Sequence, residues 1–406
     1  MKIARTNLFK VVFTLVIYSI VYGIAIIGDF VLMRKINNQV DAIGGEGRRI
    51  MNDRYQMQDL ALIAAAEREG YQYRILLPSV IEKSPKLQVL STKFGFAPLG
   101  LEANKKLSIC NEGDGLLKLS TDRFGFRNLD SVWNTTLTNR FVLVGDSFAF
   151  GLCQQHQNSL VGHLGSQFNI VNLSFPGATA VHYAAMIKIF QPRIKADKVV
   201  LIFYANDNMS VQGSQHYHDL FFGPQSAASR YFDQSGVLMP AAAHQDFYQA
   251  VREEVQHQKD IELQEEKGNT NSALRRIKQL FSHYSFPGAR TVFKAYRSSR
   301  EDGTDSLELA VGTLRMYCQS TKCKPLVVYI PNSQFWDPDG RSAEFAASVA
   351  NTTEKYGISF IDLSNEINRL GADAYSKAGI HLSGSGYALV AGAIRDYFSR
   401  EKAGRK

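Results

Sequence analysis

Cysteine is scarce in this 406-residue chain, and no run of lysine and arginine is dense. The four cysteines lack the spacing and the accompanying histidines of a zinc site, so the sequence predicts no metal. The net charge of +8 is spread along the chain, which argues against a nucleic-acid partner. Internal repeats and low-complexity runs are also missing. The composition is that of a folded protein with room for one large domain and an appendage, or for two domains.

Long apolar runs are equally few, and a single stretch is apolar enough to cross a membrane. Residues 11–28 carry no charge, and their neighbours extend the apolar length to roughly residues 9–33. No small-residue cleavage pattern follows this stretch, and it is longer than the apolar part of an ordinary signal peptide. The sequence therefore predicts that residues 1–36 form a retained signal anchor with one transmembrane helix.

The charges around this segment decide its orientation only weakly, because basic residues both precede and follow it. The cysteines give a further indication. Their number is even, and Cys318 and Cys323 lie close together in the sequence. An exported domain with one or two disulfides fits this pattern, and reduced buried thiols are the alternative. We therefore expect a single-pass membrane protein with its folded part on the periplasmic or extracellular side.

The chain after the anchor falls into two parts. Residues 37–137 are interpreted as a juxtamembrane helical stalk and a lead-in, with residues 37–75 expected to be helical. Residues 138–406 alternate β-branched runs with helical stretches, which predicts an α/β fold in which helices cover both faces of a five-stranded parallel sheet. The predicted strands are 141–144, 170–173, 199–203, 326–330 and 358–361, and the predicted helices are 156–168, 180–194, 306–318, 342–356 and 385–400.

Residues 209–305 interrupt this alternation. They separate the third and fourth predicted strands by far more than a normal crossover needs. The segment is polar and aromatic at first, then charge-rich, then amphipathic, which predicts a helical insertion. At this place in the fold it would overhang the carboxyl edge of the sheet, either as a substrate lid or docking surface or as a plain helical addition.

A serine follows the first predicted strand directly, in the run Gly145-Asp146-Ser147. A serine on a sharp strand-to-helix turn presents its hydroxyl and its own backbone N–H to the same space, as a nucleophile for acyl transfer must. Alone the tripeptide is a weak signal, because strand-to-helix turns commonly contain these residues.

Two further strands end in candidate oxyanion donors. Gly177 follows the second strand, and a glycine there can offer its backbone N–H without a side chain in the way. Asn206 follows the third strand, where its amide can supply another donor. The next residue, Asp207, is expected to cap the local backbone. In a parallel sheet these turns share one edge, so we expect both donors to lie near Ser147.

A histidine precedes the last predicted helix, in the run Gly379-Ile380-His381. Most histidines in loops are structural or solvated. This one follows the fifth strand, so it can return to the same edge as Ser147. Histidine takes and returns protons near neutral pH, which suits a general base.

These blocks resemble the SGNH, or GDSL-like, hydrolase superfamily over about residues 138–400, without the insertion. Ser147 falls at the family's nucleophile, Gly177 and Asn206 at its oxyanion residues, and His381 at its catalytic histidine. The resemblance implies a flavodoxin-like three-layer α/β/α sandwich and cleavage or transfer of an ester. His381 would accept the proton of Ser147, and the backbone N–H of Ser147 would join the oxyanion donors. No metal or organic cofactor is implied.

The stretch from Asp122 to Asn128 resembles the lead-in of a membrane-anchored bacterial subgroup. In similar sequences, one cysteine before this stretch and one after the Gly-Asp-Ser block often occur together. The resemblance therefore implies that Cys110 pairs with Cys153, and we expect Cys318 to pair with Cys323.

One position departs from the family pattern. The family usually has an aspartate three residues before the histidine, and here that position is Ala378. An aspartate elsewhere could orient His381, and Asp373 is the nearest in sequence. A backbone carbonyl could instead orient it in a Ser–His dyad, or activity could be low. The dyad is the preferred reading, because the segment that separates Asp373 from His381 is expected to be helical or turned away.

The expected function is a membrane-anchored esterase that removes or transfers O-acetyl groups on cell-surface polysaccharide. This substrate is what the resemblance to anchored, export-facing members implies. A lipid or thioester hydrolase and a sugar acetyltransferase are alternatives. The alternative from another class is a non-catalytic scaffold that binds glycan or a partner.

Overall fold

The computed structural model describes residues 61–73, 78–134, 138–165, 167–208, 211–224, 230–233, 235, 237–254, 303–332 and 341–403. None of the helices within these ranges is both long and apolar enough to span a membrane. The predicted anchor, residues 1–36, and residues 37–60 of the predicted stalk lie outside the described residues.

A five-stranded parallel sheet carries the candidate site, as the sequence predicts. The strand order is β5-β4-β6-β7-β8, so the chain leaves β4 for one side of the sheet and then returns to the other. In sheets of this order, ligands bind where the order reverses, at the carboxyl ends of the strands. The five strands are β4 (Arg140–Val144), β5 (Asn169–Asn172), β6 (Lys198–Tyr204), β7 (Lys324–Ile330) and β8 (Ser359–Asp362).

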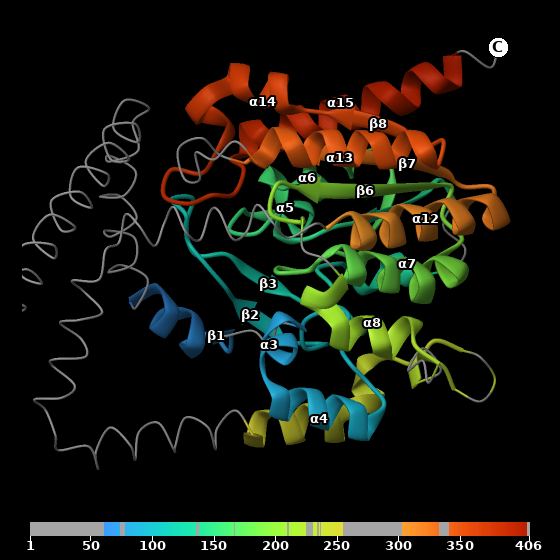
Figure 1. Cartoon of the computed structure of the whole chain (residues 1–406). Helices are drawn as coiled ribbons and strands as arrows, with labels where there is room; N and C mark the ends of the chain where they lie inside the picture. The colour runs from blue at the N-terminus through green and yellow to red at the C-terminus, as the bar shows by residue number, and fades with distance from the viewer. Residues whose placement is uncertain are drawn as a thin grey trace, which may run out of the picture. The chain divides into compact units, whose positions relative to one another are not determined.

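Helices cover both faces of this sheet, and the side chains of β4 show why. Phe141 and Leu143 belong to one buried cluster, and Val142 and Val144 belong to the other, because successive residues of a strand point to opposite faces. Figure 1 shows the sheet between these layers. The predicted α/β/α sandwich is confirmed. One face carries α7 (Ala180–Ile194), α12 (Thr304–Thr321) and α13 (Arg341–Lys355), and the other α6 (Leu160–Leu164), α14 (Ser364–Leu370) and α15 (Gly384–Ala403).

The lead-in forms a second, three-stranded sheet of order β1-β2-β3. Residues 61–68 are helical, but the expectation of a helix up to residue 75 is wrong. Gly70 has a φ of 84°, which stops the helix, and the chain then pairs with β2. The strands are β1 (Gln72–Tyr73), β2 (Lys106–Ser108) and β3 (Lys118–Ser120), and α3 (Pro78–Lys83) and α4 (Pro85–Phe94) lie between the first two.

The run from Asp122 to Asn128 attaches the lead-in to the parallel sheet. The carboxylate of Asp122 accepts hydrogen bonds from four donors of its own segment, among them the indole N–H of Trp133 in η1 (Asp130–Trp133) at 2.8 Å. Asn128 exchanges two hydrogen bonds, of 2.9 and 3.0 Å, with the backbone of Asn172 at the end of β5. The side chain of Asn128 thereby takes the place of a neighbouring strand.

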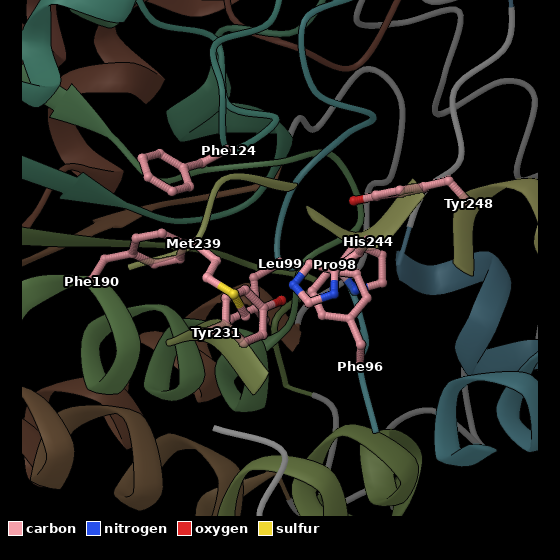
Figure 2. Close-up of a pocket in the computed structure, with 9 residues that line it drawn as sticks. All are labelled: Phe96, Pro98, Leu99, Phe124, Phe190, Tyr231, Met239, His244 and Tyr248. Carbon is pink, nitrogen blue, oxygen red and sulfur yellow. The ribbon is translucent and has the colours of Figure 1, made fainter. Parts of the chain in front are cut away.

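The insertion packs, in its described part, against the lead-in. The hydroxyl of Tyr217, in α8 (Gln215–Phe222), donates to the carbonyl of Pro98 at 3.0 Å, and that of Tyr231 donates to the carbonyl of Ala97. Figure 2 shows the aromatic cluster that joins the insertion to the lead-in. In it, His244 of η5 (Ala241–His244) stacks on Phe96, with the ring centroids 3.7 Å apart. The cluster encloses about 10 Å³, room for one water molecule.

The described part of the insertion runs from the carboxyl edge of the sheet to the lead-in. The described part begins in η3 (Val211–Ser214), where the hydroxyl of Ser214 lies 3.0 Å from that of Thr179, close after Gly177. From there it runs to the lead-in, and Arg252 pairs with Glu102 at 2.6 Å. The predicted charge-rich part, residues 250–266, begins in a described helix that ends at residue 254. Residues 255–302, which hold its remainder and the amphipathic part, lie outside the described residues, so the predicted lid stays a prediction.

Candidate active site

Ser147 is the first residue of α5 (Ser147–Phe150), directly beyond β4. Gly145 allows this sharp turn, because a Cβ there would lie 2.6 Å from Cβ of Ala149. Asp146 caps the short helix by accepting the N–H of Phe148 at 2.8 Å. Because Ser147 follows β4, its hydroxyl and its backbone N–H both lie at the carboxyl edge of the sheet. The N–H groups of a first helical turn have no partner within the helix, so this N–H is available as a donor.

The two candidate oxyanion residues follow the strands on either side of β4. Gly177 comes after β5, is exposed and has a φ of 79°, a conformation that suits glycine. Asn206 is the second residue after β6 and is also exposed. Asp207 accepts the backbone N–H of Tyr204 at 2.8 Å, which confirms its expected capping role. The three strand ends that carry Ser147, Gly177 and Asn206 are therefore adjacent.

The histidine loop meets the serine. Nε2 of His381 lies 3.1 Å from Oγ of Ser147, within hydrogen-bond reach. The ring packs beside Phe148, with their centroids 5.0 Å apart, and only 9% of the histidine side chain is exposed. The backbone of this loop is held by Ser376, whose N–H donates to the carbonyl of His381 at 2.8 Å.

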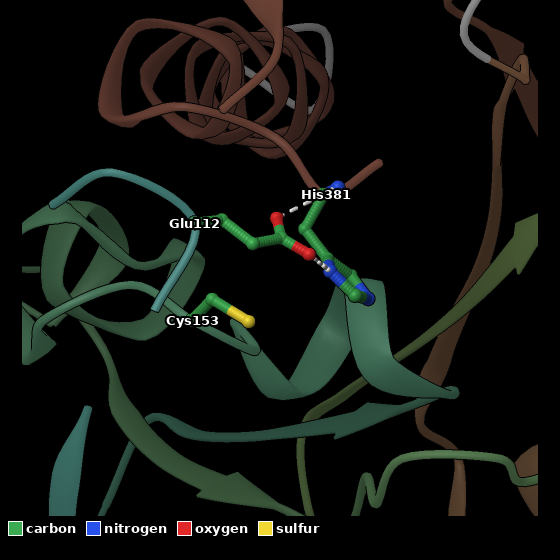
Figure 3. A group of neighbouring side chains, drawn as sticks. All are labelled: Glu112, Cys153 and His381. Atoms are coloured by element: carbon green, nitrogen blue, oxygen red, sulfur yellow. Dashed lines mark hydrogen bonds and ion pairs between the residues drawn. The ribbon is translucent and has the colours of Figure 1, made fainter. Parts of the chain in front are cut away.

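Glu112 is the acidic partner of His381, a residue that is not among the sequence-based candidates. Its Oε1 lies 2.7 Å from Nδ1 of His381, and its Oε2 accepts the backbone N–H of the same residue at 3.2 Å. Figure 3 shows the carboxylate reaching the histidine from the lead-in. The side chain of Glu112 is 14% exposed. The expectation of a Ser–His dyad with a carbonyl at Nδ1 is therefore wrong.

Asp373 does not fill this role. It lies exposed in η6 (Gly371–Ala374), where its carbonyl accepts the hydroxyl of Ser383. The expectation that the segment between Asp373 and His381 is helical or turned away is wrong, because Tyr375 pairs with Leu382 and the N–H of Ser376 donates to the carbonyl of His381 at 2.8 Å. The carboxylate that contacts His381 comes from a distant part of the chain, because Glu112 precedes the histidine by 269 residues.

Glu112 belongs to the acid loop, residues 109–117, which joins β2 to β3. The loop closes on itself through Asn111, whose side-chain oxygen accepts the N–H groups of Gly113 and Gly115 at 2.9 and 3.1 Å. The N–H of Ala378 donates to the carbonyl of Glu112 at 3.0 Å. The position of the usual aspartate thus contacts the residue that replaces it.

Gly379 makes room for the glutamate. A Cβ at this position would lie 1.7 Å from Cδ of Glu112, far inside contact distance. The residue does not have a positive φ, so its backbone does not require glycine. The space taken by Glu112 is what requires it.

Both cysteine pairs of the structure match the sequence-based pairing. Cys110, in the acid loop, is bonded to Cys153, in the turn after α5, with Cα atoms 5.2 Å apart. Cys318, near the end of α12, is bonded to Cys323, just before β7, with Cα atoms 4.5 Å apart. The first bond lies at the candidate site and the second at the amino end of a strand.

Buried carboxyls lie beneath the serine. Burial raises the pKa of Asp146 to about 6, although the N–H of Phe148 and the charge of His381 lower it. Burial and the charge of Asp146 raise the pKa of Asp207 well above its ordinary value, and the hydroxyl of Tyr183 donates to Asp207 at 2.8 Å. Both carboxyls serve local backbone and hydroxyl donors, so they are placed to hold the turns and not to orient Nδ1 of His381.

The site also contains a group of possible metal donors. Glu112, His381 and Cys153 have donor atoms within 4.8 Å of one another (Figure 3). The sulfur of Cys153 is bonded to that of Cys110, so it is not a thiolate ligand. A carboxylate and one imidazole remain, which is fewer than the three protein ligands of a typical catalytic zinc site.

One sequence signal could have located Glu112. The expected bond between Cys110 and Cys153 brings residue 110 to the turn that follows the nucleophile. A carboxylate two residues after that cysteine then lies within reach of the site. Periodicity alone could not show this, because the acid loop has no repeating pattern.

The sequence matches no family model and no curated protein. Several solved structures are similar in fold. The esterase EstA of a Pseudoalteromonas species is 10% identical, with a TM-score of 0.34 over 65% of this chain and 99% of that one. A GDSL-like lipase from Bacteroides thetaiotaomicron is 9% identical, with a TM-score of 0.33 over 68% and 91%. A catalytic mutant of an acetylxylan esterase from Geobacillus stearothermophilus is 14% identical, with a TM-score of 0.30 over 63% and 92%.

Proposed function

We propose that this chain is a serine ester hydrolase of the SGNH (GDSL-like) class, with a Ser147–His381–Glu112 triad. The observation that carries the proposal is the continuous chain of contacts from Oγ of Ser147 to Nε2 of His381 at 3.1 Å, and from Nδ1 to Glu112 at 2.7 Å. A nucleophile, a base and a group that orients the base are the three parts that acyl transfer requires.

The contacts define the path of the proton. The carboxylate of Glu112 can only accept a hydrogen bond from Nδ1, so the proton of a neutral His381 ring resides on Nδ1 and Nε2 is free to accept. As Oγ of Ser147 attacks the ester carbonyl, its proton moves to Nε2, and the carboxylate of Glu112 stabilises the imidazolium. His381 then donates this proton to the departing alcohol. A water molecule, deprotonated by the same nitrogen, hydrolyses the acyl-serine.

The oxyanion is the second requirement. We place its donors at the backbone N–H of Ser147, the backbone N–H of Gly177 and the side-chain amide of Asn206. The support is their position after the adjacent strands β4, β5 and β6. A donor aimed at the developing negative charge is typically worth about 2.7–4 kcal/mol of the barrier.

For the substrate we propose an acyl ester, in particular an O-acetyl group on a cell-surface glycan. The support is the resemblance of the run from Asp122 to Asn128 to anchored, export-facing members of the superfamily. The charge-free residues 11–28 support a membrane anchor. The two disulfides support a periplasmic or extracellular location, because such bonds persist in oxidising compartments. A non-catalytic scaffold has no need of the triad contacts.

The experiment is an esterase assay on the full-length protein in detergent, with short-chain aryl esters, acetylated glycans and a thioester as substrates. Ser147→Ala should lower kcat on aryl esters by a factor on the order of 10⁶, the loss typical of a missing serine nucleophile. A fluorophosphonate should label Ser147 in the wild type, as mapped by mass spectrometry. Wild-type turnover that survives in Ser147→Ala would contradict the proposal.

A further inference from the structure

The disulfide between Cys110 and Cys153 joins the two halves of the candidate triad. Cys110 precedes Glu112 by two residues, and Cys153 follows Ser147 by six. The sulfur of Cys153, a carboxylate oxygen of Glu112 and a ring nitrogen of His381 all lie within 4.8 Å of one another (Figure 3). The bond thus links the segment that carries Glu112 covalently to the segment that carries Ser147. It lies beside the contact between Glu112 and His381.

The acid loop is anchored at its end by Leu117, which is fully buried in the core, but among the described residues few other contacts fix the part that carries Glu112. The hydrogen bonds of Asn111 lie within the loop and give it shape without attaching it to the sheet. Towards the rest of the domain, Asp114 accepts from the side chain of Gln154 at 2.8 Å, and the carbonyl of Leu116 accepts from that of Gln155 at 3.3 Å. The carbonyl of Glu112 accepts the N–H of Ala378. Each such hydrogen bond is weak on its own.

The turn that carries the other cysteine is itself held firmly. The guanidinium of Arg127 donates to the carbonyls of Phe150, Gly151 and Gln154 at 3.2, 2.8 and 2.9 Å. Cys153 has a φ of 59° and is 2% exposed. A residue other than glycine keeps such a backbone only when its surroundings fix it. Cys153 is therefore a rigid point to which the acid loop is attached.

We propose that the Cys110–Cys153 disulfide is a positioning element of the esterase, which holds Glu112 against His381 and makes turnover depend on the oxidised state. The proposal rests on the proposed function. A dithiol reductant would supply two electrons and two protons: the S–S bond breaks, two thiols form, and the reductant closes its own disulfide. The middle of the acid loop then keeps hydrogen bonds as its links to the site, although Leu117 at its end stays buried in the core, and Glu112 leaves His381 for part of the time.

The second disulfide is a matched control within the same chain. Cys318 and Cys323 are also buried and bonded, at 4% and 7% exposure. Their bond lies where α12 meets the start of β7, which is the amino end of that strand. The candidate site lies at the carboxyl ends. Removing either bond lowers stability, but only the first should alter the contact between Glu112 and His381.

The experiment compares the full-length Cys110→Ala/Cys153→Ala and Cys318→Ala/Cys323→Ala variants with wild type on p-nitrophenyl acetate, below their unfolding temperatures. The first pair should lower kcat by a factor of about 10 to 10³ with KM nearly unchanged, because Glu112 orients the base and does not bind the substrate. The second pair should leave kcat within about twofold.

A combined variant separates positioning from general damage. If the disulfide acts through Glu112, adding Cys110→Ala/Cys153→Ala to Glu112→Gln should cost no further activity. A multiplicative loss would overturn the proposal, as would equal losses from the two cysteine pairs. If the first pair does not fold, wild type is reduced with dithiothreitol until mass mapping shows free Cys110 and Cys153. Turnover should then fall and return on reoxidation, and unchanged turnover would overturn the proposal.

The wild-type protein distinguishes this proposal from the proposed function. Wild type that neither hydrolyses the ester nor is labelled at Ser147 would contradict the proposed function itself. Wild type that does both, while the Cys110→Ala/Cys153→Ala variant retains full kcat, would overturn the disulfide proposal alone.

Discussion

The two sides of the candidate site are built in different ways. Ser147 and His381 stand at the ends of regular elements, one directly after β4 and one just before α15. Glu112 stands in a loop between two three-residue strands, held by a disulfide and accommodated by a glycine. The sheet places its residues by topology alone. The acid loop needs specific contacts, so its position is the easier one to disturb.

Among the variants that disturb the acid loop but leave the sheet intact, Gly379→Ala is expected to lower turnover the most. The added Cβ would lie 1.7 Å from Cδ of Glu112, so the carboxylate has to move away from His381. The backbone permits alanine there, and we expect the fold to persist. Turnover should fall by a factor of about 10² or more, towards the level of a triad without its acid.

Gly392→Ala is the matched control for this variant. Gly392 lies in α15, and a Cβ there would meet no atom within 4 Å. Alanine in a helix is about 0.5–1 kcal/mol more favourable than glycine, so this variant should be at least as stable as wild type, with unchanged kcat. Steady-state kinetics measures the turnover of both variants, and thermal unfolding shows whether each variant is folded. Equal kcat values for the two would show that Gly379 makes no room for a functional Glu112.

A smaller effect is expected from a substitution in the insertion, which should lower the stability of the fold without lowering turnover. Tyr217→Phe removes the hydroxyl that donates to the carbonyl of Pro98. The free energy of unfolding should fall by about 0.5–1.5 kcal/mol, the usual net value of one hydrogen bond. Denaturant titration measures this loss. Because the contact lies in the lead-in away from the acid loop, kcat should stay within about twofold, and a large loss of kcat would place the insertion closer to the chemistry than we infer.

The smallest expected effect is a change in the pH dependence of stability. Burial raises the pKa of Glu82, in α3, to about 7 from an ordinary value of 4.5. Between these values the folded protein binds more protons than the unfolded chain, so Glu82 lowers stability as the pH rises from about 4.5 to 7. Glu82→Gln removes this contribution. The unfolding temperature of the variant, relative to that of wild type, should rise between pH 5 and pH 8. A difference that does not change with pH would contradict the raised pKa of Glu82.

The same contrast explains what the sequence could and could not predict. The strands β4 to β7 are apolar runs that are mostly buried, while the edge strand β8 is half-buried. The sequence predicts the boundaries of all five to within two residues. Parallel strands then bring Ser147 and His381 to one edge, whatever the details of the loops. The sequence predicts none of the three strands of the lead-in, because strands of two or three residues are too short to show a period. The predicted Cys110–Cys153 bond brings the acid loop near the nucleophile, but the contact of Glu112 with His381 also needs the space at Gly379, which joins distant parts of the chain and leaves no pattern in the sequence.

The most direct test of the central claim, that the acid of the triad comes from the lead-in, compares two carboxylates in one assay. Hydrolysis of p-nitrophenyl acetate is measured for wild type, Glu112→Gln and Asp373→Asn, with each fold checked by circular dichroism. We expect kcat of Glu112→Gln to fall by a factor on the order of 10² to 10⁴, because the amide no longer holds the ring in the productive tautomer. Exposed Asp373 should matter little, with kcat of Asp373→Asn within about twofold of wild type. A fully active Glu112→Gln, or a large loss in Asp373→Asn alone, would contradict the account.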